Sequence, residues 1–140
     1  MSDFEPYADW LHGLAYLSGV QTRNLPAWQR PIAFVQQLAV AHLNNGAGSL
    51  FYNHPDKIGP VVESLAMIGE PELADLVRSI SKNVAPVLRK GGADLQARLA
   101  VCIDGPEAPL CERLDKLIEE RWSELHRKMR DLADAGGWRP

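Results

Sequence analysis

The stretch Asn44–Glu72, with the sequence NNGAGSLFYNHPDKIGPVVESLAMIGEPE, contains the ends and beginnings of several predicted helices. An apolar segment ends at Asn44–Gly46, and Asn or Gly just past a last helical turn can adopt the left-handed conformation that other residues avoid. Leu50–Tyr52 follows as a short apolar and aromatic group. Asn53–Asp56 then favours a turn, because Asn, Pro and Asp are common turn residues. This half of the stretch therefore predicts one helix end and a short buried turn after it.

The second half of the stretch predicts a new helix and the start of another. Pro60 suits the first helical position after Gly59, and Gly69 is expected to stop the segment. Apolar side chains between these two points recur at helical spacing and form an inward face: Val61, Val62, Leu65, Ala66 and Ile68. A further helix is expected to begin at Pro71.

The chain before and after this stretch also reads as helices. Residues 4–18 carry apolar side chains three and four apart, and a loop is expected over residues 19–26. The helix that begins at Pro71 is expected to be interrupted at Asn83 and Pro86, because proline lacks the N–H donor that a helix interior uses.

Two more helices are expected toward the C-terminus. A short one covers residues 95–104, and a long one runs from Leu110 to Leu132 until Gly136 ends it. The apolar residues in the second half of the long helix follow a four-three-four-three spacing, which would also suit a helix-mediated homodimer. Residues 136–140 are expected to form a frayed tail.

These patterns predict an all-α fold. No stretch alternates apolar and polar residues over a useful strand length, so we expect a single compact domain, residues 1–140, of about six to eight helices. The expected core comprises Leu38, Phe51, Leu65, Ile68, Leu76, Leu117, Ile118 and Trp122. Trp28, between two prolines, is instead expected to be an exposed anchor for a partner.

Composition narrows the classes of function. The formal net charge of −3 disfavours direct binding to nucleic acid, although the basic stretch 78–100 is the region that would bind it in a salt-sensitive manner. Cys102 and Cys111 lack metal-ligand spacing, which favours a reduced cytoplasmic protein without a cofactor. The N-terminus has neither the basic nor the apolar region of a signal peptide, and no apolar run reaches the length of about 18 residues that a membrane span needs.

The central stretch also carries an ordered set of motifs: an Asn-Gly step, aromatic residues followed by Asn, an Ile-Gly step, and a second helix. The matching residues are Asn45, Gly46, Leu50, Phe51, Tyr52, Asn53, Leu65, Ile68, Gly69 and Pro71–Ala74. In this order they resemble the signature of the DNA mimic protein 19-like family, small bacterial all-helical proteins long catalogued as a domain of unknown function. Ala47, Gly48 and Ser49 depart from that pattern. The resemblance covers about residues 30–130.

The resemblance implies that a protein partner is bound by mimicry, in which an acidic face occupies the DNA-binding surface of a transcription factor. The candidate residues for such a face are Glu112, Asp115, Glu119, Glu70, Glu72 and Asp75. The first three fall at i, i+3 and i+7, away from the apolar stripe of the last helix, and the others would extend the field if the two segments lie side by side. Arg113 and Lys116 interrupt the row, so a solvated helix face is the competing interpretation.

The side chains give little sign of catalysis. His54 with Asp56 is the one pair suited to acid-base chemistry, and a structural turn explains the same residues. His42 is expected to pack or to bond a local carbonyl, and no histidine shows metal-ligand spacing. We therefore predict a non-enzymatic protein-binding domain with no catalytic, metal or cofactor site. A toxin-neutralising, immunity-like protein and a small enzyme using His54 and Asp56 are the alternatives.

Overall fold

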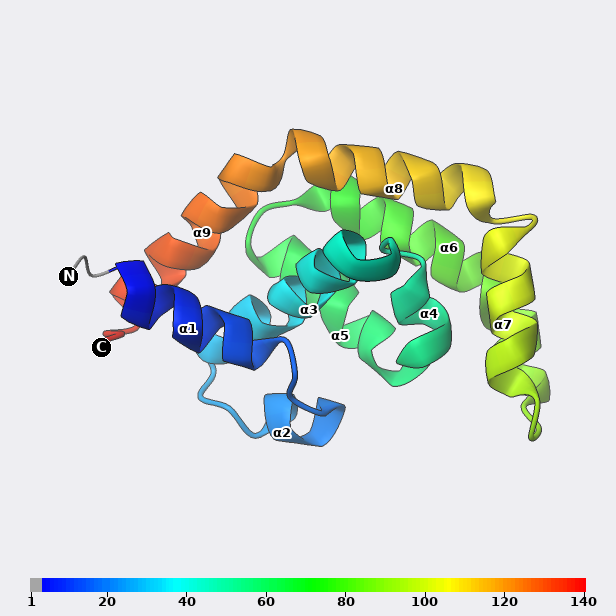
Figure 1. The fold of residues 1–140 in the computed structure, drawn as a ribbon, viewed down its shortest axis with the longest axis horizontal. Helices are drawn as coiled ribbons and strands as arrows, with labels where there is room; N and C mark the ends of the chain where they lie inside the picture. The colour runs from blue at the N-terminus through cyan, green and yellow to red at the C-terminus, as the bar shows by residue number, and fades with distance from the viewer. Residues whose placement is uncertain (1–3) are drawn as a thin grey trace.

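The structure is a computed structural model that describes residues 4–140. Within this range the chain forms nine α-helices, one 3-10 helix and no strand, which confirms the predicted all-α class (Figure 1). The helices are α1 (Phe4–Leu14), α2 (Gly19–Arg23), α3 (Gln29–Asn45), α4 (Ser49–Asn53), η1 (Pro55–Lys57), α5 (Ile58–Met67), α6 (Pro71–Lys90), α7 (Leu95–Asp104), α8 (Ala108–Glu120) and α9 (Trp122–Ala135). None of these helices is both long and apolar enough to cross a membrane.

The central stretch folds largely as its residues predict. Helix α3 ends at Asn45, and Gly46 follows with a φ of 88°, in the left-handed region that favours glycine. The short helix α4 is the predicted buried turn, with Phe51 only 1% exposed. Gly69, with a φ of 81°, separates α5 from α6. The predicted boundaries at Gly46 and Gly69 are confirmed, whereas α5 begins at Ile58 rather than at Pro60 because η1 leads directly into it.

Helix α6 shows where the prediction of a break was wrong. It runs unbroken through Asn83 and Pro86, although proline removes one backbone hydrogen bond from the helix. Val84 is buried on one side of Pro86, and Val87 packs against the core on the other. Burial on both sides offsets the lost hydrogen bond and keeps the helix continuous.

Two other boundaries also differ from expectation. The predicted loop over residues 19–26 contains α2, which Ser18 caps: its hydroxyl oxygen accepts from the Gln21 amide at 3.0 Å, and the Gln21 side chain accepts from the Ser18 amide at 2.8 Å. The predicted long last helix divides at Arg121 into α8 and α9. These two features bring the number of helices above the expected range.

The core lies where α3, α5, α6, α8 and α9 meet, with α3 at its centre (Figure 1). Five members of the predicted core are buried: Leu38, Phe51, Leu65, Ile68 and Ile118. Three others, Leu76, Leu117 and Trp122, are only partly buried. Their helical spacing placed them correctly on apolar faces, but within the described chain no element covers them completely.

An aromatic cluster joins the two ends of the described chain, where α1 lies beside the end of α9 (Figure 1). Trp138 is 9% exposed and meets the Tyr7 ring edge-on at a centroid distance of 5.3 Å. Trp10 lies 6.0 Å from Trp28, and a side chain added at Gly136 would collide with the Trp28 ring. Trp28 is therefore half-buried rather than an exposed anchor, and Trp138 packs into the fold instead of fraying.

Candidate protein-binding site

Helices α6 and α8 lie side by side and run in opposite directions. At one end Asn83 of α6 donates to a Glu107 carboxylate oxygen, just before α8, at 2.8 Å. At the other end Arg121, just after α8, donates to Glu70, just before α6. These two contacts fix the antiparallel arrangement, which brings the acidic start of α6 beside the acidic end of α8 (Figure 1).

A groove of about 550 Å³ runs between the two helices. Leu76 of α6 and Leu110 and Leu117 of α8 line it, and all three are half-buried. The charged residues that line it are Glu72, Asp75, Arg113, Lys116 and Glu120. The groove thus combines incompletely covered leucines with charges of both signs.

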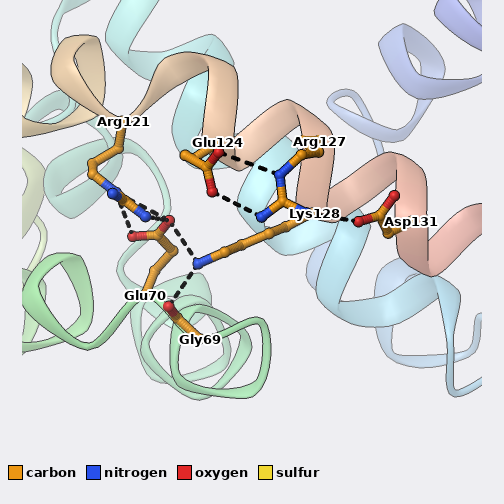
Figure 2. A network of polar contacts seen from close by, with 7 residues as sticks. All are labelled: Gly69, Glu70, Arg121, Glu124, Arg127, Lys128 and Asp131. Atoms are coloured by element: carbon orange, nitrogen blue, oxygen red, sulfur yellow. Dashed lines mark hydrogen bonds and ion pairs between the residues drawn. The ribbon is translucent and has the colours of Figure 1, made fainter.

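Glu70 is not part of this surface, so its assignment to an exposed acidic face was wrong. It is 3% exposed, and its carboxylate accepts from Arg121 Nη2 at 2.8 Å and Nε at 3.0 Å and from Lys128 Nζ at 3.1 Å (Figure 2). Burial raises the pKa of Glu70, but the hydrogen bonds from Arg121 and Lys128 outweigh it and hold that pKa below its usual value. Lys128 also donates to the Gly69 carbonyl at 2.7 Å. The network ties the α5–α6 joint to α9.

Asp115 and Glu119 are engaged on the opposite flank of α8 from the groove. His42 Nδ1 lies 2.7 Å from Asp115, and His42 Nε2 lies 2.5 Å from Glu119. Asp115 also accepts from the Ala47 amide at 2.8 Å, in the loop that follows Gly46. His42 therefore bonds two carboxylates far along the chain rather than a local carbonyl. The acidic row consists of an exposed Glu112 and two acids that already have a partner.

This contact explains much of the Asn-Gly motif. A Cβ at Gly46 would lie 3.3 Å from an Asp115 oxygen, and one at Gly48 would lie 2.7 Å from the Ile103 side chain. Asn53 accepts from Gln96 Nε2 of α7 at 2.9 Å. The motif residues thus hold α4 against α7 and α8, a structural role that accounts for their spacing without a ligand.

The contact of His42 with Asp115 and Glu119 should make the stability of the protein depend on pH. Burial lowers the pKa of His42, but its hydrogen bonds to Asp115 and Glu119 outweigh that effect and raise the pKa above the usual 6.5. A histidine whose pKa is higher in the folded state than in the unfolded state stabilises the fold. This stabilisation is complete below the unfolded-state pKa and is lost as the pH rises through the folded-state pKa. We expect the melting temperature to fall more for the wild type than for His42→Gln as pH rises from about 6 upward.

The matched control for this prediction is His126→Gln, because His126 Nδ1 meets the Trp122 carbonyl oxygen rather than a carboxylate. Its melting profile should follow that of the wild type. Parallel profiles for wild type and His42→Gln from pH 5.5 to 8.5 would contradict the role given to His42.

The tertiary structure adds little support for acid-base chemistry at His54 and Asp56. Both side chains are exposed, and no hydrogen bond joins them in the described part of the chain. The neighbouring Lys57 is 4% exposed and donates to the Leu17 carbonyl at 2.9 Å. Burial and the charge of Lys57 lower the pKa of His54, against the opposite effect of Asp56. The turn is therefore best explained as a support for the loop after α1.

Burial raises the pKa of both cysteine thiols and disfavours their reactive thiolate form. Burial, reinforced by nearby carboxylates, raises the pKa of the Cys111 thiol to about 11, so the thiolate form is disfavoured. Cys102 and Cys111 are free thiols. Within residues 4–140, no group of three or more His, Cys, Asp or Glu side chains is placed to hold a metal ion.

Sequence reasoning missed several residues that the structure brings together. Glu120, Arg113 and Lys116 line the groove, and Arg121 and Lys128 hold Glu70. The break between α8 and α9 at Arg121 has no local signal in the sequence, because no glycine or proline marks it. The charged face of α8 could be recognised in the sequence, because Arg113, Lys116 and Glu120 lie three and four residues apart and therefore share one face of a helix.

Comparisons with protein-family models, with curated proteins and with solved structures found no match for this chain. The class of protein is accordingly defined by its structure: an all-helical fold with a mixed-charge groove between two antiparallel helices. The resemblance to the DNA mimic protein 19-like family stays a prediction.

Proposed function

We propose that this chain is a non-enzymatic protein-binding domain that holds its partner in the α6–α8 groove. The observation that carries the proposal is the incomplete burial of Leu76 and Leu117. Both follow the spacing of a helix core, yet both are only partly covered and line the groove with Leu110. Apolar side chains grouped on a surface and rimmed by charges are typical of binding sites for other proteins.

The contacts of the acids favour groove binding over acidic mimicry. A DNA mimic needs a continuous row of free negative charge, because duplex DNA carries about one charge per 1.7 Å of its axis. Here Glu70 is buried between two cations, and His42 engages Asp115 and Glu119. The free acids that lie together are Glu72 and Glu120, and they share the groove with Arg113 and Lys116. A transcription factor or a neutralised toxin would therefore be bound through mixed contacts.

The test is affinity capture of the partner from an extract of the source cell with matched variants. Leu117→Gln should lose the captured protein while reducing stability by only about 1 kcal/mol, because Leu117 is half-buried. Val101→Gln is the control, since Val101 is 72% exposed on α7, away from the groove. Melting temperatures establish that both variants are folded.

A third variant separates groove binding from mimicry. It carries Gln at the three acids of the other flank of α8: Glu112, Asp115 and Glu119. Groove binding predicts that this variant captures the partner as the wild type does, whereas mimicry predicts that capture is lost. Capture that survives Leu117→Gln but not the triple change would overturn the proposal in favour of mimicry.

A further inference from the structure

The charges of the α6–α8 groove are segregated along its length. Because Glu70 meets Arg121 and Asn83 meets Glu107, the register of the two helices places Glu72 and Glu120 at the same end. Arg113 lies toward the opposite end, beside Leu110 and Ser79. In the middle, Asp75, which pairs with Arg78, is level with Lys116, so charges of both signs lie there. The groove is thus acidic at one end, mixed in the middle and basic at the other.

The charges at the two ends form no ion pair within the described chain, although the charge of Glu72 acts on the nearby Arg121, which is paired with Glu70. Neither Glu72, Glu120 nor Arg113 takes part in an ion pair there, although the chain forms several others, such as Arg78 with Asp75 and Arg127 with Glu124. All three side chains are exposed. Their charges are consequently free to meet complementary groups on a bound polypeptide.

The length of the groove matches a helical partner. Leu110 and Glu120 stand ten residues apart on α8, which corresponds to about 15 Å along the helix axis. Three apolar side chains at i, i+3 or i+4, and i+7 span about 10 Å, the separation of Leu110 and Leu117 along α8, and would reach these two leucines and Leu76. An antiparallel pair of helices with an uncovered apolar seam is completed by a third helix lying along it.

Building on the proposed function, we infer that the groove binds an amphipathic helix of about three turns that carries opposite charges at its two ends. Its basic end lies over Glu72 and Glu120, its acidic end lies over Arg113, and its apolar stripe contacts the three leucines. This layout defines the partner segment by sequence: an apolar stripe at helical spacing with Lys or Arg at one end and Glu or Asp at the other.

Synthetic helical peptides of about 18 residues test the inference directly. All carry the same apolar stripe. One has Lys at one end and Glu at the other, a second has Gln at both ends, and a third has Glu at both ends. In fluorescence anisotropy at low ionic strength, the wild type should bind the Lys/Glu peptide about tenfold more tightly than either of the others, and added salt should reduce the difference.

A protein variant with reversed charges at the acidic end of the groove should reverse the peptide preference. In Glu72→Lys with Glu120→Lys, both ends of the groove become basic, so affinity for the Lys/Glu peptide should fall about tenfold and the Glu/Glu peptide should become the tightest. The control, Asp9→Lys with Glu63→Lys, makes the same change in net charge at two exposed residues outside the groove. It should keep the wild-type order of affinities.

Equal binding of the three peptides to the wild type would overturn the charge layout, and so would a failure of all three to bind. A shift in preference for the control equal to that of the charge-reversed protein would also overturn it, because net charge alone would then explain the effect. The capture experiment with Leu117→Gln judges the proposed function separately. A groove that captures its partner but ignores peptide charge would retain that function and lose only this inference.

Discussion

Replacing Phe51 with alanine is expected to lower the free energy of unfolding by about 3–5 kcal/mol, a large part of the 5–15 kcal/mol typical of a domain. Phe51 is 1% exposed in α4, within the core between α3 and α7. Removal of its ring deletes buried apolar area and leaves a cavity, because the short helix is fixed on both sides and cannot collapse into the space. Chemical denaturation followed by circular dichroism measures the loss.

Tyr52→Ala is the matched control for Phe51→Ala. Tyr52 is the next residue in the same helix and a similar aromatic, but its side chain is only partly buried. It should cost clearly less than Phe51→Ala. Equal costs for the two substitutions, or unchanged unfolding of Phe51→Ala, would mean that α4 does not form the buried joint.

Glu70→Ala should have the second large effect, a loss of about 2–3 kcal/mol in unfolding free energy. The Glu70 side chain is 4% exposed, and its removal leaves Arg121 and Lys128 without the carboxylate that both bind. This loss is at or below the roughly 3–5 kcal/mol for breaking a fully buried pair, because Arg121 and Lys128 are only partly buried and water can reach them once the contact is lost. The substitution also releases the α5–α6 joint from α9, which Figure 2 shows held through Glu70 and Gly69.

Glu72→Ala is the control for this prediction, since Glu72 is exposed two positions away in the chain and forms no ion pair within residues 4–140. Its effect on stability should stay within about 0.5 kcal/mol. Similar melting of the two alanine variants would contradict the structural role of Glu70.

The Glu70 contact should also appear in the acid limb of the stability profile. Its folded pKa is lowered from the usual 4.5, so the stabilisation is complete above that value and is lost as pH falls through the folded pKa. The difference in unfolding free energy between wild type and Glu70→Gln should therefore be constant near neutral pH and shrink below about pH 4.5. A difference that persists unchanged to pH 2.5 would rule out the charge as its source.

Local features of the sequence were enough to define the helices around the central stretch. Gly46 and Gly69 mark helix ends because a positive φ is a property of one residue and its neighbours. The same reasoning failed at Pro86, where burial of Val84 and Val87 outweighs a local preference, and at Arg121, where no residue type signals the break.

The candidate site could be predicted only in part. Glu72 and Asp75 were identified as candidate binding residues and do line the groove, whereas Glu70, from the same acidic segment, is buried. The sequence around a Glu or Asp residue does not show whether a cation from another part of the chain will pair with its carboxylate. Arg121 and Lys128 lie far along the chain from Glu70, and only the packing of α9 against the α5–α6 joint brings them together.

The sequence by itself determined the all-α class, the helix ends at Gly46 and Gly69, and which face of each long helix is apolar, because periodicity and backbone preference act over a few neighbouring residues. Only the tertiary structure decided which apolar residues are covered and which charges are paired. Leu65 and Leu117 have the same kind of spacing, yet Leu65 is enclosed and Leu117 lines an open groove. That difference depends on where α6 and α8 lie relative to each other, which long-range packing sets.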